Sequence, residues 1–179
     1  MKKALFLDRD GTLIEHKPYL HKPEEIVLLP GTIRALRRAR DASFLLFLFT
    51  NQSGVGRGYF SLEDVHRVHK RLIELIGLGP DIFTEICIAP ELPNEVSAYR
   101  KPSPRFIREM LVKYNLTATE CWMIGDSVSD WEAGKFAAIS TAAVRSDKFS
   151  PEVEQIANSL GLSVFENLAA FADCYITPS

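Results

Sequence analysis

Residues 6–12 read FLDRDGT, and this stretch decides the fold that the sequence predicts. The apolar run at 4–7 ends directly in two acids, Asp8 and Asp10, and Gly11 then permits a sharp turn. A buried strand that ends in carboxylates is typical of the carboxyl edge of a parallel sheet, where α/β proteins bind ligands. There, Asp8 can attack phosphorus as a carboxylate, and Asp10 can act as acid and base. An acidic turn without chemistry is the alternative interpretation of these seven residues.

The same alternation of apolar runs and helical patterns continues along the chain. Four further apolar runs predict buried strands, at residues 44–49, 82–89, 121–124 and 141–144. Three serines with N-cap signatures indicate helix starts, Ser61, Ser103 and Ser150. The sequence therefore predicts an α/β fold with a doubly wound, Rossmann-like, mostly parallel sheet and helices on both faces. Segments 11–29 and 90–102 are expected to be irregular loops that shape the pocket.

Composition limits the partners and the location of the protein. The 179 residues, 46% of them hydrophobic, are expected to form a single domain over 1–179. A net charge of -2 without a basic cluster favours a small-molecule partner over nucleic acid or a membrane surface. Three separated cysteines, and apolar runs too short for a signal peptide or a bilayer span, predict a cytoplasmic protein. Its oligomeric state stays open between a monomer and a small homo-oligomer.

The loop after the second predicted strand is a candidate phosphate site. Residues 49–58 read FTNQSGVGRG, in which Thr50 and Asn51 precede a glycine-rich turn. Backbone N–H groups in such a turn, together with the Thr50 hydroxyl and the Asn51 amide, can hold a phosphate. Arg57 is a candidate second clamp on that phosphate. A glycine-rich turn kept for steric reasons, with Arg57 in solvent, is the alternative.

Two later groups complete the candidate chemistry. Lys101, which follows Arg100, can neutralise negative charge that gathers around Asp8 during reaction, although surface solvation is common for such a pair. The stretch MIGDSVSD at residues 123–130 again ends a strand in an acid, Asp126. Mg2+ prefers oxygen ligands, and Asp126 is the better candidate ligand of this stretch. Asp130 is open to three roles: orienting a metal-bound water, orienting the lysine, or capping the next helix.

In this order, at the ends of separate strands, the four groups resemble motifs I to IV of the haloacid dehalogenase (HAD) superfamily, over about residues 4–145. DRDGT together with TNQSG is similar to the capless branch, which contains histidinol-phosphate phosphatases and D-glycero-D-manno-heptose 1,7-bisphosphate 7-phosphatases. No segment between the motifs is long enough for a cap domain. The resemblance implies a Mg2+-dependent phosphatase that forms an aspartyl-phosphate intermediate.

The resemblance also implies a role for each site residue. It makes Asp8 the nucleophile and Asp10 the acid/base. Three acids would bind Mg2+: Asp8, Asp126 and, through its backbone carbonyl, Asp10. The residues implied to bind the phosphoryl group are Thr50, Asn51 and Lys101, and those implied to face the substrate are Arg57 and Arg100.

The chain departs from the branch in a zinc loop that many members carry, with the pattern CPHHP followed by CxCRKP. The matching stretches here read APELP at 89–93 and SAYRKP at 97–102. The ligand positions of the pattern hold Ala89, Glu91, Ser97 and Tyr99 in this chain, so no structural zinc is expected. A second departure is Ser127, where heptose bisphosphatases tend to have lysine.

A sugar phosphate or bisphosphate, such as heptose 1,7-bisphosphate, is the expected substrate, with a role in carbohydrate metabolism. The segment GVGRG at 54–58 is similar to the heptose bisphosphatase pattern. Histidinol phosphate is the near alternative. Polynucleotide 3'-phosphatases share GxGRG and YRKP, but the missing basic bias counts against that reading. An inactive binding module would be expected to lose some of Asp8, Asp10, Lys101 and Asp126, and all four are present.

Overall fold

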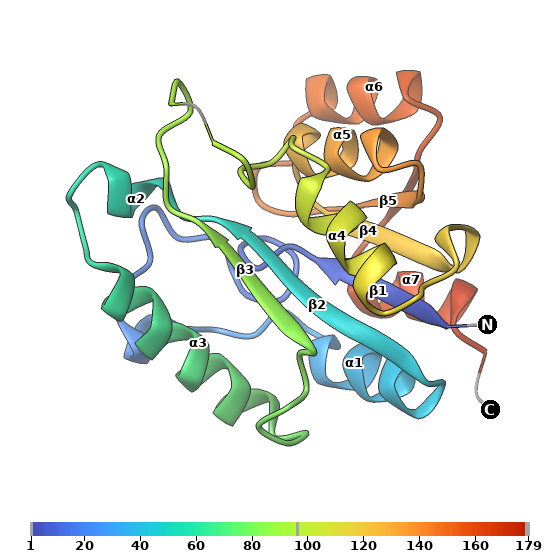
Figure 1. Cartoon of the computed structure of the whole chain (residues 1–179), viewed down its shortest axis with the longest axis horizontal. Coiled ribbons are helices and arrows are strands. Elements are labelled where there is room, and N and C mark those ends of the chain that lie inside the picture. The colour runs from blue at the N-terminus through green and yellow to red at the C-terminus, as the bar shows by residue number, and fades with distance from the viewer. Residues whose placement is uncertain (1, 96, 178–179) are drawn as a thin grey trace.

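The computed structural model describes residues 2–95 and 97–177, and its strands form one six-stranded parallel sheet in the order β3-β2-β1-β4-β5-β6. The strands are β1 (Lys3–Leu7), β2 (Phe44–Asn51), β3 (Glu85–Ala89), β4 (Cys121–Gly125), β5 (Ser140–Val144) and β6 (Ser163–Phe165). The chain builds β1 to β3 in one direction and then returns to build β4 to β6 in the other (Figure 1). The reversal lies between β1 and β4, the place where α/β sheets of this kind bind ligands.

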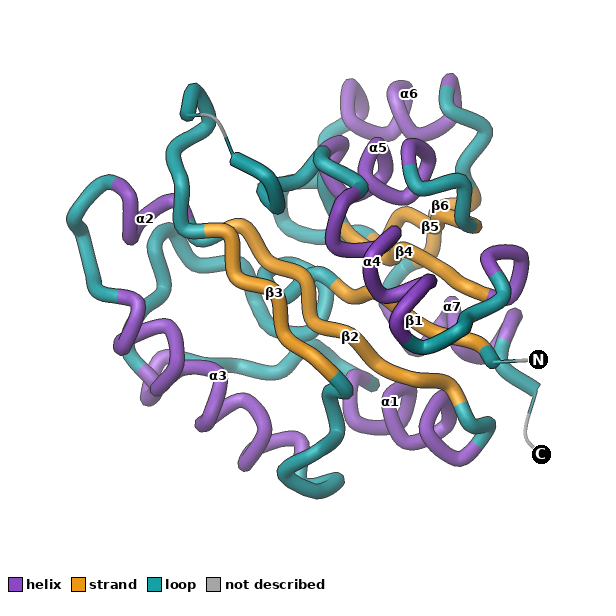
Figure 2. The backbone as a smooth tube through the Cα atoms, viewed as in Figure 1, coloured by secondary structure: helices purple, strands orange, loops and turns teal. Residues whose placement is uncertain are grey.

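Helices cover both faces of the sheet, as expected (Figure 2). On one face lie α1 (Thr32–Asp41), α3 (Leu62–Ile76) and α7 (Leu168–Tyr175). On the other lie α4 (Arg105–Lys113) and α5 (Val128–Phe136), with α6 (Pro151–Ser159) packed against α5. The short α2 (Ser53–Gly56) follows β2, and two 3-10 turns lie at Pro23–Glu25 and Ala118–Glu120. In the described ranges, no helix is both long and apolar enough to cross a membrane.

The first strand shows why its sequence is apolar from Ala4 to Leu7. Leu5 and Leu7 face the core under α1 and α3, whereas Ala4 and Phe6 face the core under α4. Phe6 stacks on Phe47 of β2 with ring centroids 4.8 Å apart. Because side chains alternate between the two faces and both faces are covered, the strand has no solvent side. This rigid central strand delivers the acids at its carboxyl end.

Two of the three predicted helix starts are confirmed. Ser61 forms a capping box with Asp64, and the Ser150 hydroxyl accepts from the N–H of Val153. The third is displaced: α4 begins at Arg105 with Pro104 as its N-cap. The Ser103 hydroxyl instead donates to the carbonyl of Ala98 at 2.6 Å, which ties it to the preceding loop.

The strands also differ from expectation at the edges of the sheet. β3 begins at Glu85, three residues later than predicted, because Ile82 and Phe83 fill the core from a turn before the strand. β6 was not predicted, since three residues are too short to show a period. The segment at 11–29 is mostly irregular, but Ile14 forms isolated bridges with Asp10 and Leu28 and is buried. That anchoring fixes the loop beside the carboxyl ends of the strands.

Candidate active site

A cavity of about 400 Å³ opens at the carboxyl ends of β1, β2 and β4. Its walls come from residues 8–10 after β1, 16–20 of the following loop, and 51–54 after β2. The remaining lining residues are Phe60, Arg100, Lys101, Asp126, Ser127, Ser129 and Lys148. Five segments of the chain, within 8–20, 51–60, 100–101, 126–129 and at 148, therefore meet at the point where the strand order reverses.

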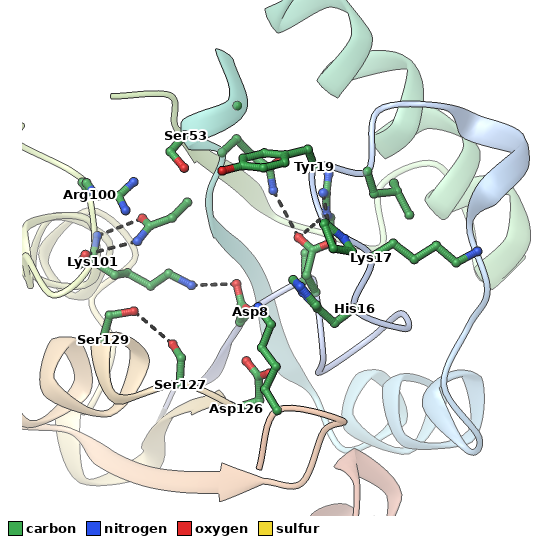
Figure 3. A pocket seen from close by; sticks show the side chains of 18 of the residues that line it. Asp8, His16, Lys17, Tyr19, Ser53, Arg100, Lys101, Asp126, Ser127 and Ser129 are labelled. Atoms are coloured by element: carbon green, nitrogen blue, oxygen red, sulfur yellow. Dashed lines mark hydrogen bonds and ion pairs between the residues drawn. The ribbon is translucent and has the colours of Figure 1, made fainter. Parts of the chain in front are cut away.

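Asp8 lies at the bottom of this cavity and is held from two sides. Its backbone N–H donates to the carbonyl of Ile124 at 3.0 Å, which continues the ladder between β1 and β4. Its Oδ1 accepts from Nζ of Lys101 at 2.6 Å (Figure 3). The same Nζ donates to the carbonyl of Phe49 at 2.8 Å and lies 2.5 Å from Oδ1 of Asp130. Lys101 is thus a buried cation that joins motifs from β1, β2 and β4.

Three buried acids share this single lysine. Carboxylate oxygens of Asp8, Asp126 and Asp130 lie within 4.8 Å of one another. Burial raises the pKa of Asp8 well above its ordinary value, although Lys101 opposes the shift. Burial and then the Asp130 carboxylate raise the pKa of Asp126 to about 6. Burial alone would lower the pKa of Lys101, but Asp130 and Asp8 more than reverse that effect and raise it.

This cluster fits a hard divalent cation. When ionised, three carboxylates carry more negative charge than the one ammonium group of Lys101 balances, and all the available ligand atoms are oxygens. Both oxygens of Asp130 are already engaged, one with Lys101 and the other with the hydroxyl of Ser127 at 2.6 Å. Asp8 and Asp126 are therefore the carboxylates best able to hold Mg2+.

Asp130 combines two of the three roles left open by the sequence. Its Oδ2 accepts from the backbone N–H of Ser127 at 3.1 Å and completes a capping box at the start of α5. Its Oδ1 pairs with Lys101 and so orients the ammonium group. A Cβ at Gly125 would lie 2.3 Å from the Asp130 carboxylate, so a glycine is needed at the end of β4.

Asp10 also lines the cavity, but its carboxylate is paired with Arg9. Its two oxygens accept from Nε of Arg9 at 2.9 Å and from Nη2 at 3.1 Å. Nε2 of Gln52 adds a third contact at 3.2 Å. The pairing fixes the orientation of the Asp10 carboxylate relative to Asp8.

Comparisons with known proteins agree with this geometry. A family model described as HAD-hydrolase-like matches residues 98–171. The D-glycero-beta-D-manno-heptose-1,7-bisphosphate 7-phosphatase of Pseudomonas aeruginosa is 30% identical over 98% of this chain and 98% of its own length. The enzyme of the same name from Pasteurella multocida is 35% identical over 83% and 84%. The chain belongs to the HAD-superfamily phosphatases.

Solved structures of HAD phosphatases show the same architecture. The D,D-heptose 1,7-bisphosphate phosphatase from B. bronchiseptica, solved with magnesium and phosphate, aligns with a TM-score of 0.85 at 28% identity. The alignment covers 96% of this chain and 97% of that one. A HAD-like phosphatase from Mesorhizobium loti aligns with a TM-score of 0.71 at 29% identity, covering 89% and 86%. The predicted fold class is confirmed by this likeness together with the observed sheet.

Two of the predicted phosphate-binding residues of this HAD phosphatase are engaged in holding its loops together. The Thr50 side chain is buried outside the cavity lining, and its hydroxyl accepts from Nε2 of Gln52 at 2.8 Å. Asn51 lines the cavity and forms a reciprocal pair with the backbone of Lys101, at 3.1 Å and 3.0 Å. The pair joins the loop after β2 to the lysine loop, so Asn51 positions Lys101 in the structure as it stands.

The two arginines predicted to face the substrate differ in their placement. Arg100 lines the cavity (Figure 3). Its Nη1 donates to the carbonyl of Glu91 at 3.0 Å. Arg57 is exposed on the turn after α2 and is not part of the lining. A contact between Arg57 and substrate stays a prediction.

The loop that replaces the zinc pattern in this HAD phosphatase is held by hydrogen bonds among its described residues. The Ser97 hydroxyl accepts from the backbone N–H of Arg100 at 2.9 Å, and the Tyr99 hydroxyl donates to Glu109 of α4 at 2.9 Å. Ala89 ends β3 inside the core. These contacts fix the approach to Lys101.

Several lining residues were not singled out from the sequence. They are His16, Lys17, Tyr19, Gln52, Ser53 and Lys148. Lys148 follows β5, so attention to the loop after every predicted strand would have found it. His16 to Tyr19 lie in a loop expected to shape the pocket, but no spacing marks one residue over another.

Proposed function

We propose that the chain is a Mg2+-dependent phosphomonoesterase that hydrolyses a sugar bisphosphate, D-glycero-D-manno-heptose 1,7-bisphosphate, through an aspartyl phosphate on Asp8. The observation that carries the proposal is the buried Asp8 at the bottom of the cavity, with Lys101 at 2.6 Å and Asp126 beside it. The names of the relatives supply the substrate.

The residues divide the chemistry in two steps. In the first, an oxygen of Asp8 attacks phosphorus, the ester P–O bond breaks, and Asp10 gives a proton to the departing alkoxide. In the second, Asp10 takes a proton from a water that attacks the same phosphorus. Phosphate then leaves and Asp8 is regenerated as a carboxylate. Lys101 offsets the negative charge that gathers in both steps.

Mg2+ would be held by Asp8, Asp126 and the backbone carbonyl of Asp10. Bound there, it would polarise the phosphoryl oxygens and balance the carboxylate charge. The charge left unpaired by Lys101 supports this assignment. The magnesium in the B. bronchiseptica enzyme supports the choice of metal.

The cavity wall supports a substrate with a second anion. Besides Lys101, the side chains of Arg100 and Lys148 add positive charge to the lining, whereas Nζ of Lys17 donates to the carbonyl of Glu25 and burial lowers the pKa of His16. Such a lining exceeds what one phosphate on Asp8 needs. Histidinol phosphate carries a cationic side chain in place of the second anion and is the competing substrate.

We also propose that the protein works as a single domain in the cytoplasm, as a monomer or small homo-oligomer. All strands in the described ranges belong to one sheet, and helices cover both of its faces. Cys87, Cys121 and Cys174 are free thiols, which suits a reducing compartment.

Phosphate release from heptose bisphosphate, histidinol phosphate and 3'-phosphorylated DNA tests the assignment. We expect the highest kcat/KM on the bisphosphate. Asp8→Asn should lower turnover by roughly three orders of magnitude or more, because the amide is nearly isosteric but a poor nucleophile. Asp81→Asn, in an exposed turn before β3, is the matched control and should equal the parent. Substantial turnover by Asp8→Asn would remove Asp8 from its role, and a preference for histidinol phosphate would replace the substrate.

A further inference from the structure

Arg9, the residue between the two acids of DRDG, is among the largest fully buried side chains of the protein, with 1% of its surface exposed. Its Nε and Nη2 hold the Asp10 carboxylate as a two-pronged fork. Its Nη1 lies 3.3 Å from Nε2 of His69, which is 3% exposed on α3. The guanidinium therefore bridges Asp10 to a histidine sixty positions further along the chain.

The chemistry of the bridge fixes the state of the imidazole ring. A guanidinium group has only donors, so Nε2 of His69 must accept and the proton of the neutral ring must lie on Nδ1. Burial, then the charges of Arg9 and His66, lower the pKa of His69 to about 3, which agrees with a neutral ring. His69 is therefore an acceptor for Arg9 at any pH near neutrality.

Packing alone does not account for a histidine at this position. Its Nδ1 is buried and has no hydrogen-bond partner in the described part of the chain. A buried donor without a partner destabilises the fold, and a leucine would fill similar space without that penalty. The compensating contact of the ring is the one with Arg9.

We propose that His69 is a positioning residue for Asp10: it accepts from Nη1 of Arg9 and so holds the Arg9 fork, and with it the Asp10 carboxylate, in line for proton transfer. The proposal rests on the proposed function. Without His69, Nη1 is a buried charged donor that turns toward another acceptor, and the fork tilts with it. Proton transfer requires close alignment of donor and acceptor, so a tilt slows the steps in which Asp10 takes part.

The leaving group separates this role from a purely structural one. A sugar alkoxide is a poor leaving group and needs a proton from Asp10, whereas p-nitrophenolate leaves without one. His69→Leu should therefore slow single-turnover release of the sugar alcohol about 10- to 100-fold, but change the p-nitrophenol burst by less than about threefold. Hydrolysis of the aspartyl phosphate also needs Asp10, so the slower second step should make the phosphoenzyme accumulate with p-nitrophenyl phosphate.

Three further variants complete the test. His69→Gln keeps an acceptor within reach of Arg9 and should recover most of the sugar-phosphate rate. His66→Asn, on the exposed side of α3, should match the parent on both substrates. Should circular dichroism show that His69→Leu does not fold, His69→Met replaces it, because its flexible chain adapts to the same space without accepting strongly.

The outcomes are distinct. Equal rates for His69→Leu and the parent, or equal losses on the sugar phosphate and in the p-nitrophenol burst, would overturn the positioning role. Failure of His69→Gln to recover more than His69→Leu would also overturn it. A parent enzyme that releases phosphate from neither substrate would instead refute the proposed function.

Discussion

Replacing Asp126 by Asn should make the metal-free protein more stable at neutral pH, although it removes a proposed Mg2+ ligand. Asp126 is 7% exposed, and burial and Asp130 raise its pKa from 3.8 to about 6. The folded state therefore holds this proton more tightly than the unfolded state. Ionisation of Asp126 thus lowers the free energy of unfolding as pH rises from about 4 to about 6. A shift of roughly two pKa units corresponds to about 3 kcal/mol.

The comparison between the parent and Asp126→Asn isolates this effect from that of all other acids. In EDTA, the two free energies of unfolding should agree below about pH 4, where Asp126 is protonated in both states. The variant should become more stable above that pH and lead by up to about 3 kcal/mol above about pH 6. In the proposed site Mg2+ is held through Asp126, so its addition should stabilise the parent and leave the variant nearly unchanged.

Urea unfolding at several pH values, with EDTA and with Mg2+, measures these quantities, and Asp81→Asn is the control for losing one surface acid. A variant that is less stable than the parent in EDTA near neutral pH would refute the claim that the folded state resists ionisation of Asp126. A lead that does not change with pH would refute it as well. Equal stabilisation of both proteins by Mg2+ would show that Asp126 does not hold the metal.

Four other outcomes follow from the site. EDTA should abolish phosphate release, and added Mg2+ should restore it. Ca2+ should restore little, because the looser coordination shell of Ca2+ misplaces the attacking carboxylate. Full activity in chelator would show that the reaction needs no metal. Elemental analysis should find no stoichiometric zinc, and one tightly held zinc per chain would show that the loop at 89–102 was misaligned. Lys101→Met should lower kcat alike on a bisphosphate and an aryl phosphate. It should also lower the free energy of unfolding in urea by about 3–5 kcal/mol, because it leaves buried acids without their cationic partner. A loss of activity confined to one substrate would contradict the position of Lys101 beside Asp8. Arg100→Ala should lower kcat/KM on the bisphosphate by about one to two decades more than on the aryl phosphate. Arg57 lies outside the cavity, so the difference between the two substrates should be smaller for Arg57→Ala. Equal losses on both substrates would exclude a contact between either arginine and a remote anion.

The central strands and the meeting of the acids were predictable because both depend on short-range pattern plus one topological rule. Apolar runs of four to eight residues identify buried strands, and parallel strands bring their carboxyl ends to one edge. Asp8 follows β1 and Asp126 follows β4, and their carboxylate oxygens lie within 4.8 Å of one another. The rule does not require the helices or the loops to be placed accurately. Lys101, in a loop twelve residues after β3, lies outside the rule, and its role at the phosphoryl group was implied by the resemblance.

Contacts made by residues without a repeating pattern were not predictable in the same way. The engagement of Asn51 with the backbone of Lys101 depends on the relative height of two loops, which no spacing encodes. His16 and Lys148 face the same cavity from loops more than a hundred residues apart. Neither loop carries a motif, and a single basic residue in a loop is most often solvated. The residues on the sides of the cavity could therefore be placed only from the structure, whereas the acids at its bottom could be placed from the sequence.

Arg9 shows where a sequence argument could have gone further. Arg9 lies between the two acids that follow β1, and it borders the cavity although only 1% of its surface is exposed. An arginine buried to this degree has five donors to satisfy. Asp10 accepts from one edge of the guanidinium, through Nε and Nη2, so the acceptor for Nη1 has to come from whichever element covers that side. The structure supplies it as His69 of α3. The helix that packs over β1 is thus constrained by chemistry as well as by packing, and that constraint can be tested by substituting one side chain at a time.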